Sequence, residues 1–145
     1  MRIETSTVIN ASAEATWHVL GEQFADIGEW FDGVLESSID GDVEEGATRT
    51  CKLANGDITE LLTHFSRESR SLTYAVSSGL PSFMGDVQNA WTIEIVDDNR
   101  CRVTSVVTAD LAWFAIPMTP LLRLNLGRTI RSLLEQLDNR AGGTA

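Results

Sequence analysis

Basic residues are scarce in this sequence. Eleven Lys and Arg stand against 21 Asp and Glu, which gives a formal net charge of -10. Because phosphate binding needs clustered Lys and Arg, this balance argues against a partner made of nucleic acid. So acidic a chain should also be repelled by anionic membrane surfaces. The excess of carboxylates otherwise indicates solubility, since net charge reports on solubility and non-specific association rather than on fold.

Long apolar runs and closely spaced cysteines are missing as well. The longest apolar run, residues 111–122, is interrupted by prolines and falls well short of the roughly 20 residues that a membrane-spanning helix needs. Residues 1–10 contain no apolar core of signal-peptide length, and Cys51 and Cys101 lack the spacing of metal ligands. We therefore expect no membrane span, no metal, no cofactor and a cytoplasmic protein with two free thiols.

The short motifs of several enzyme classes are also absent. The chain has no Ser-His-Asp order with a nucleophile motif, no H-E-x-x-H, no C-x-x-C, no Walker-type loop and no G-x-G-x-x-G. Nucleophilic, metal and phosphate chemistry therefore have no support, and whether the protein is an enzyme stays open.

A long helix near the C-terminus is the clearest pattern that is present. Residues 119–139 carry one apolar stripe with helical spacing, formed by Leu122, Leu126, Ile130, Leu133 and Leu137. Gly142 and Gly143 follow as a stop signal. Gly127 lies inside the helix, where it indicates either close packing or space left for a ligand. We expect one domain over residues 1–140 and a disordered tail over 141–145.

The rest of the chain predicts strands and turns. A first strand at 2–9 precedes a helix that ends at Gly21 and a short helix at 24–30. Six further strands are predicted, at 34–40, 47–53, 57–66, 71–78, 87–96 and 101–110. This order is typical of the α+β class, and the long helix would bury its stripe by lying across an antiparallel sheet.

Several short segments, in this order and spacing, resemble one superfamily. They are Val8-Ile9-Asn10-Ala11 before Ala15-Thr16-Trp17, Gly46-Ala-Thr-Arg49, Asn55-Gly56 before Glu60, Arg70-Ser-Leu-Thr-Tyr74 and the terminal helix. With them the chain resembles the START/Bet v 1-like (SRPBCC) superfamily, nearest to its bacterial polyketide cyclase/dehydrase-type branch. The resemblance implies a helix-grip fold, in which a seven-stranded curved antiparallel sheet surrounds the long C-terminal helix. Two short helices would follow the first strand, and an internal cavity would hold a lipophilic ligand.

Strand alternation suggests which side chains point inward. Asn89 and Trp91 share the inner face of their strand, where Trp91 is either a core aromatic or a pocket wall. The resemblance places Arg49 and Glu60 inward on neighbouring strands, either as a structural ion pair or as a polar anchor for a ligand. Along the strand at 57–66, His64 shares a face with Glu60 and could act as a general base. Arg49, Glu60 and His64 are thus the catalytic candidates.

The expected ligand-binding residues come from every part of the predicted cavity. They are Trp30, Arg49, Glu60, Leu62, Tyr74, Met84, Asn89, Trp91, Ser105, Trp113, Met118, Leu122 and Asn125. The apolar segments 80–84 and 113–118 would form the mouth of the cavity, or else a contact between two copies in a homodimer.

Two functions follow from this arrangement, and a third remains open. The first is a carrier or sensor that binds a small hydrophobic molecule between sheet and helix. The alternative is a polyketide cyclase, aromatase or dehydratase that uses the same cavity. The third is an interaction module of the same superfamily, which a large apolar patch without an internal void would favour.

Overall fold

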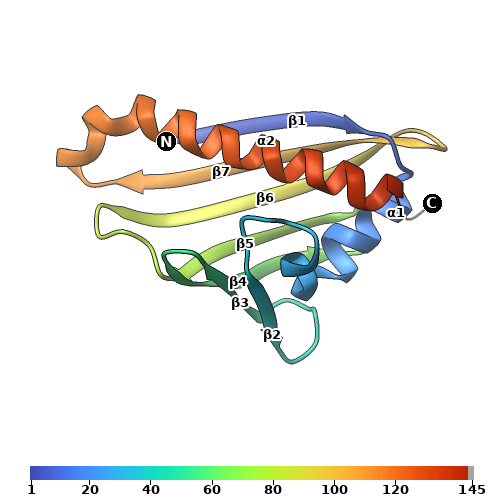
Figure 1. The fold of residues 1–145 in the computed structure, drawn as a ribbon, viewed down its shortest axis with the longest axis horizontal. Helices are drawn as coiled ribbons and strands as arrows, with labels where there is room; N and C mark the ends of the chain where they lie inside the picture. Colours follow the sequence, from blue (N-terminus) through green and yellow to red (C-terminus); the bar gives the residue numbers. More distant parts are fainter. Residues whose placement is uncertain (144–145) are drawn as a thin grey trace.

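Seven strands and one long helix make up most of the computed structural model, which describes residues 1–143 (Figure 1). The first half contains β1 (Arg2–Ile9), α1 (Ala13–Trp17), a π-helical turn η1 (His18–Glu22) and a 3-10 helix η2 (Phe24–Glu29). The strands β2 (Glu36–Asp40), β3 (Thr48–Leu53), β4 (Gly56–Ser66), β5 (Ser71–Ser78), β6 (Met84–Asp97) and β7 (Arg100–Leu111) follow. A 3-10 helix η3 (Trp113–Met118) leads into α2 (Thr119–Gly143).

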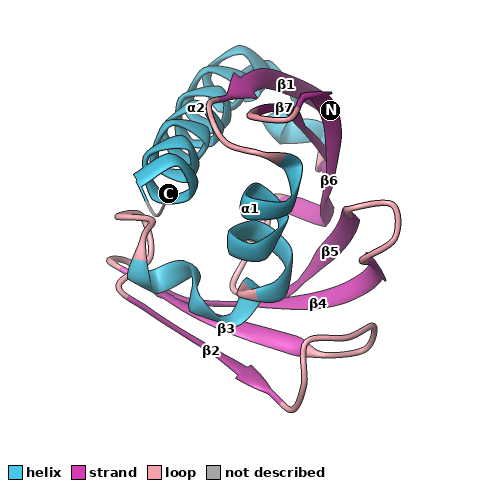
Figure 2. Cartoon of the chain, turned by 90° about the vertical axis from the view of Figure 1, so that its right-hand side faces the viewer, coloured by secondary structure: helices cyan, strands magenta, loops and turns pink. Residues whose placement is uncertain are grey.

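The strands form one antiparallel sheet in the order β1-β7-β6-β5-β4-β3-β2. Only β1 leaves its sequence neighbours, because it pairs along β7 rather than β2. The sheet curves, and α2 lies across its concave side with α1, η1 and η2 closing one end (Figure 2). The predicted helix-grip architecture is thereby confirmed.

The C-terminal helix is longer than its sequence pattern indicates. It continues through Gly142 and Gly143, although two glycines were expected to end it. Ala141 is buried, and Gly142 packs close to the backbone oxygen of Asn10. Tertiary contact thus holds a last turn that glycine alone would disfavour. Of the tail expected over 141–145, the first three residues are helical, and 144–145 lie outside the described residues.

The packed core lies mainly against the C-terminal half of α2. Leu133, Leu134 and Leu137 of α2 are buried against the sheet and α1. Toward the start of the helix, Leu122 and Leu126 are only half-buried although they belong to the same apolar stripe. Two of the five residues of the predicted stripe are therefore not packed into the core.

A β-bulge changes the facing of residues in β4. The pairing of β4 with β5 shifts between Leu62 and His64, so Thr63 is an extra residue on the bulged strand. Glu60 and Leu62 before the bulge point inward, whereas beyond it Phe65 points inward against Trp17. His64 consequently faces outward, which strict alternation had not predicted.

Candidate functional site

A cavity of about 480 Å³ lies between the sheet and the N-terminal half of α2. The helix contributes Leu126, Thr129, Ile130 and Leu133 to its walls. The other lining residues are Ile27, Phe31, Gly33, Val34, Arg49, Cys51, Leu53, Ala54, Asn55, Ile58, Glu60, Tyr74, Val76, Val87, Asn89 and Val107. Most of these side chains are apolar, so the cavity is suited to a small hydrophobic molecule.

An ion pair lies in one wall of this cavity. Arg49 on β3 and Glu60 on β4 are directly opposite each other in the sheet register. The Nε and Nη2 atoms of Arg49 both approach Glu60 Oε1, at 2.9 and 2.7 Å. Both residues are buried, with 3% and 7% of their surface exposed. The inward facing of both residues, implied by the resemblance, is what the structure shows.

Further contacts fix the guanidinium of Arg49. Its Nη1 donates a 2.9 Å hydrogen bond to the backbone oxygen of Phe24, and the group lies 3.8 Å from the centre of the Phe24 ring. The Tyr74 ring lies on another side at 5.1 Å. An arginine stacked on aromatic rings, hydrogen-bonded through Nε and Nη1 and ion-paired through Nη2, is held in one orientation.

Glu60, by contrast, has one carboxylate oxygen free. Its Oε1 accepts from Arg49 and also from Cys51 Sγ, at 3.3 Å. Within residues 1–143, no group donates a hydrogen bond to Oε2, and this atom is not fully buried. Because Glu60 lines the cavity, Oε2 is an acceptor available to a molecule inside it.

The ionisable neighbours are shifted by this environment. Burial would lower the pKa of Arg49, but the charge of Glu60, with smaller contributions from Tyr74 and Cys51, raises it, so the guanidinium stays charged. Burial raises the pKa of Cys51 to about 12, and the Glu60 charge adds to the shift. The same two causes raise the pKa of Tyr74 to about 12. At neutral pH, Cys51 is therefore a thiol and Tyr74 a phenol.

A chain of polar side chains crosses the neighbouring strands. Ser105 on β7 donates to Asn89 Oδ1 at 2.8 Å, and Asn89 Nδ2 on β6 donates to the Tyr74 hydroxyl at 3.3 Å. The Trp91 side chain also hydrogen-bonds to this hydroxyl. An indole and an amide N–H both donate to the phenol oxygen, so the Tyr74 proton itself is available to a ligand. This wall thus offers an acceptor at Glu60 and a donor at Tyr74.

Sequence comparison assigns the family. A model of the family described as "Polyketide cyclase / dehydrase and lipid transport" matches residues 1–142. The chain belongs to this family. Among curated proteins, no sequence matches the chain.

Solved structures of other proteins share the fold of this family member. Norcoclaurine synthase from Thalictrum flavum superposes with a TM-score of 0.79 at 15% identity, covering 96% of this chain and 91% of that one. A second structure of that enzyme, in complex with dopamine and hydroxybenzaldehyde, gives 0.75 at 16% identity over 94% and 85% of the two chains. The protein XoxI from Bacillus cereus gives 0.78 at 22% identity over 95% and 93%. Such low identities establish the Bet v 1-like fold and nothing finer.

No helix in the described part of the chain is long and apolar enough to cross a membrane.

The structure brings four of the predicted site residues together around the large cavity, namely Arg49, Glu60, Tyr74 and Asn89. Trp30 and Trp91 border a separate small void of about 10 Å³ behind Arg49 and Tyr74. The Trp30 Nε1–H is buried there and has no acceptor among residues 1–143. Leu62 and Ser105 are completely buried behind the wall, and Ser105 acts only through Asn89.

The remaining predicted site residues do not line this cavity. Trp113 and Met118 project from η3 into solvent, and Asn125 is exposed on α2. Met84 and Leu122 are half-buried and also lie outside the lining. The expectation that the segments 80–84 and 113–118 form the mouth is corrected accordingly. In place of those two segments, four lining residues lie in or beside turns of the chain: Gly33, Val34, Ala54 and Asn55.

His64 is the clearest correction to the catalytic candidates. Its side chain is exposed on the outer face of the sheet, where Nε2 lies 2.9 Å from Ser71 Oγ and Nδ1 3.8 Å from Glu45. The bulge at Leu62–His64 is the physical reason, because one inserted residue inverts the facing of those that follow. A base for chemistry inside the cavity cannot be His64.

Several lining residues were not named from the sequence. Val87 and Val107 share the inner face of their strands with Asn89 and Ser105, so alternation alone could have identified them. Cys51 lies two residues after Arg49 on β3, so alternation places it on the same inner face. The lining residues Phe31 and Val34 come from an irregular segment after η2, where no periodicity indicates facing.

Proposed function

We propose that this protein binds one small, largely hydrophobic molecule in the cavity between the sheet and α2, as a carrier or sensor. The observation that supports this most strongly is the cavity itself, about 480 Å³ with mainly apolar walls. Sites for small molecules range over about 300–1,000 Å³ and combine apolar walls with a few polar groups. The description of the matched family mentions lipid transport, which agrees with the binding of a hydrophobic molecule.

The polar wall indicates what else the ligand carries. A hydroxyl or amine can donate to Glu60 Oε2, and an oxygen can accept from Tyr74. Three nitrogens of Arg49 are already committed to Glu60 and Phe24, so the guanidinium does not offer an uncompensated charge to an acid. We therefore propose a neutral or cationic amphiphile with a hydroxyl or amine at one end, rather than a carboxylate.

Paired probes test this proposal. Naphthalene and 2-naphthol share a shape and differ by one hydroxyl, so their difference in affinity reports the polar wall. We expect the wild-type protein to bind both, and 2-naphthol more tightly by roughly tenfold, as for one hydrogen bond to a charged group. Glu60→Gln should reduce this preference while it leaves naphthalene binding nearly unchanged.

Two valines supply a matched steric control. Val107 lines the cavity, whereas Val106 on the same strand lies on the opposite face. Val107→Phe should abolish binding of both probes, and Val106→Phe should leave it intact. Equal effects of the two substitutions, or no binding of either probe by the wild-type protein, would contradict the proposal.

The alternative function is catalysis in the same cavity, on a polyketide-like chain as a cyclase, aromatase or dehydratase. Its support is the placement of a carboxylate oxygen and a phenolic proton on one wall, which is the minimum for moving a proton onto and off a bound substrate. Arg49 would orient Glu60. Turnover of a polyketide-like substrate that is lost in both Glu60→Gln and Tyr74→Phe would favour the enzyme, and binding without turnover would favour the carrier.

We also propose a cytoplasmic location. Cys51 and Cys101 are both unpaired and buried, and free thiols of this kind are typical of a reducing compartment. Fractionation of the native host should place the protein with the cytoplasmic fraction, and recovery from the culture medium would contradict this.

A further inference from the structure

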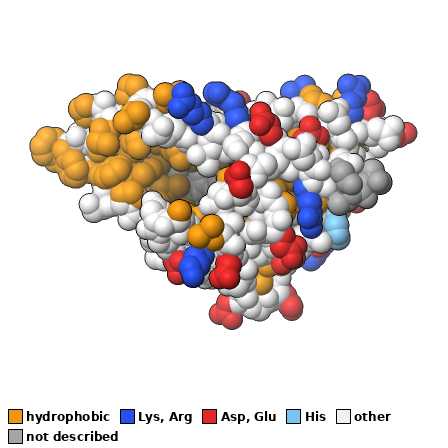
Figure 3. Space-filling model, in the orientation of Figure 1, with side chains coloured by type: hydrophobic (Ala, Val, Ile, Leu, Met, Phe, Trp, Pro, Cys, Tyr) orange, Lys and Arg blue, Asp and Glu red, His pale blue; other side chains and the backbone are white. Residues whose placement is uncertain are grey.

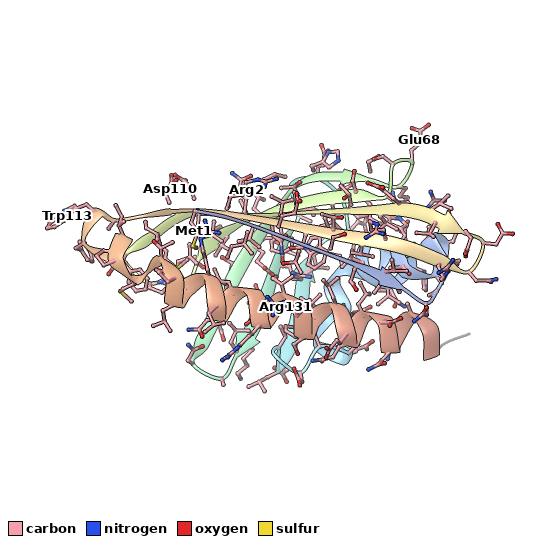
Figure 4. All side chains as sticks on the ribbon, turned by 90° about the horizontal axis from the view of Figure 1, so that it is seen from above. Met1, Arg2, Glu68, Asp110, Trp113 and Arg131 are labelled. Carbon is pink, nitrogen blue, oxygen red and sulfur yellow. The ribbon has the colours of Figure 1, made fainter. Side chains whose placement is uncertain are left out.

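A cluster of exposed apolar side chains covers one end of the molecule. It comes from η3 and the first two turns of α2, and we call it the apolar tip: Trp113, Phe114, Ile116, Met118, Leu121 and Leu124. Trp113 is 82% exposed, and the others range from 41% to 59%. Figure 3 shows this surface as a continuous hydrophobic area at one end, and Figure 4 places Trp113 at its extremity. Soluble proteins rarely expose so many large apolar side chains side by side without a partner.

The charge of this region is opposite to that of the whole chain. Between Asp110 and Glu135 the sequence contains Arg123, Arg128 and Arg131 but no Asp or Glu. All three arginines are exposed, and none forms an ion pair with a residue in the described part of the chain. Arg123 donates only to the backbone oxygen of Arg2. Three unpaired cations thus follow the apolar tip along α2, in a chain whose net charge is -10.

The outward face of α2 changes character along its length. The exposed residues of this face follow each other at spacings of three or four, in the order Leu121, Leu124, Arg128, Arg131 and Glu135. With a rise of about 1.5 Å per residue, Arg128 lies about 6 Å beyond Leu124 along the axis. Apolar side chains enter the headgroup region to a depth of about 5–10 Å while nearby arginines reach the phosphates, so the two groups are close enough to contact one bilayer surface.

We propose that the apolar tip docks on the surface of an anionic phospholipid bilayer. Trp113 and Phe114 would enter the interfacial region, and Arg123, Arg128 and Arg131 would contact lipid phosphates. The acidic groups nearest the tip, Asp86 and Asp110, are on the sheet side, so the helix side faces the lipid. The expectation that an acidic chain is repelled by anionic membranes rests on the net charge alone, whereas this proposal rests on the local distribution of charge.

A second copy of the chain is the competing occupant. A symmetric contact through the tip would bring two sets of unpaired arginines toward each other and join two chains that each carry a charge of -10. An anionic bilayer instead offers a phosphate to every arginine, so charge complementarity favours the lipid surface. Docking does not depend on the cavity being a ligand site, so the two proposals can fail separately.

Tryptophan fluorescence provides a direct test on the full chain. Trp17 and Trp91 are buried and Trp30 is half-buried, so a change in emission on vesicle binding would come chiefly from Trp113. We expect a blue shift and quenching by brominated lipid with vesicles of phosphatidylcholine plus phosphatidylglycerol. With phosphatidylcholine alone, binding should be much weaker, and added salt should weaken binding to the anionic vesicles.

Four variants separate the contributions of the tip and the arginines. The tip variant Phe114→Ser with Ile116→Ser keeps the reporter and should lose the blue shift. The charge variant Arg128→Gln with Arg131→Gln should reduce partitioning at least about tenfold, since each arginine near an anionic surface contributes about fivefold. Two controls lie at the far end of the sheet. Ile95→Ser removes an exposed apolar residue, and Arg102→Gln removes an exposed, unpaired arginine. Both controls should bind vesicles as the wild type does.

Each other result would overturn the proposal. Absence of wild-type binding to anionic vesicles, or equal losses in the tip and control variants, would show that the tip has no affinity for lipid. A concentration-dependent dimer in analytical ultracentrifugation that the tip variant abolishes, without vesicle binding, would assign the tip to a second copy instead.

Discussion

Arg49 holds Glu60 by a single carboxylate oxygen. The Nε and Nη2 atoms both approach Oε1, at 2.9 and 2.7 Å, and Cys51 Sγ approaches the same atom at 3.3 Å. A bidentate pair would have used both oxygens. The one-sided pairing compensates the buried charge and leaves Oε2 without a donor in a residue that lines the cavity, so one pair serves the stability of the wall and the polarity of the site.

The first prediction concerns the stability of this pair. Arg49→Met leaves the Glu60 carboxylate buried without its cation, and removal of one partner of a buried ion pair costs about 3–5 kcal/mol. Urea unfolding at neutral pH should show a loss of that size. The double variant Arg49→Met with Glu60→Leu should recover much of it, because no unpaired charge remains. If the double variant is as unstable as the single one, the loss arises from packing of the Arg49 stem against Phe24 rather than from charge.

The second prediction concerns alkaline pH. The chain contains one tyrosine, so the absorbance of its phenolate reports Tyr74 alone. Burial raises the pKa of Tyr74 from 10.0 to about 12. The absorbance midpoint of the folded protein should therefore lie about two pH units above that of the unfolded chain. A folded-state midpoint near 10 would show that water reaches the hydroxyl freely.

The same shift links pH to stability. A group whose pKa is raised on folding stabilises the folded state fully below its unfolded pKa and loses that contribution as pH rises through the folded pKa. For Tyr74 the window runs from pH 10.0 to about 12, and for Cys51 from 9.0 to about 12. The free energy of unfolding should fall across this range, and the fall should be smaller in Tyr74→Phe and in Cys51→Ala.

A third prediction distinguishes two glycines. A Cβ on Gly127 of α2 would meet only the far end of the Arg131 side chain, at 3.6 Å, so close packing does not explain this glycine. Gly127→Ala should stabilise the protein by up to about 1 kcal/mol, since alanine favours a helix interior. A Cβ on Gly28 would lie 3.0 Å from the backbone nitrogen of Ser37, and Gly28→Ala should destabilise it. Thermal unfolding of the two variants should shift in opposite directions.

A fourth prediction follows from the bulge in β4. His64→Ala removes an exposed side chain on the outer face, so binding of 2-naphthol should not change, whereas Glu60→Gln should weaken it. Isothermal titration of both variants makes the comparison. An equal loss in the two variants would mean that His64 influences the cavity through the strand.

Regular alternation and helical spacing made much of the fold predictable from the residues. The apolar stripe of 119–139 and the short strands before it are enough to predict an α+β domain with a helix across a sheet. The seven-stranded curved sheet came from the resemblance, since periodicity says nothing about strand order or curvature. For the site, neighbouring strands brought Arg49, Glu60, Tyr74 and Asn89 to one wall, as expected of inward positions.

Irregular elements were not predictable in this way. The bulge at Leu62–His64 depends on how β4 pairs with β5. This pairing is a property of the folded sheet, so the residues of β4 alone do not indicate the bulge. The final turn of α2 forms because Ala141 is buried, against the preference of two glycines. The lining from Phe31 to Val34 lies in a segment without a period, so no residue pattern indicates its facing.

The sequence by itself determined the elements, because side-chain period and turn residues are local properties of a chain. It also determined the acidic charge and the presence of Arg49 and Glu60 on adjacent strands. Only the tertiary structure decided that the core leaves a cavity between the sheet and α2, because a void depends on whether side chains from distant segments meet. It also decided that three unpaired arginines follow an exposed apolar tip along α2, because exposure and pairing exist only once the chain is folded.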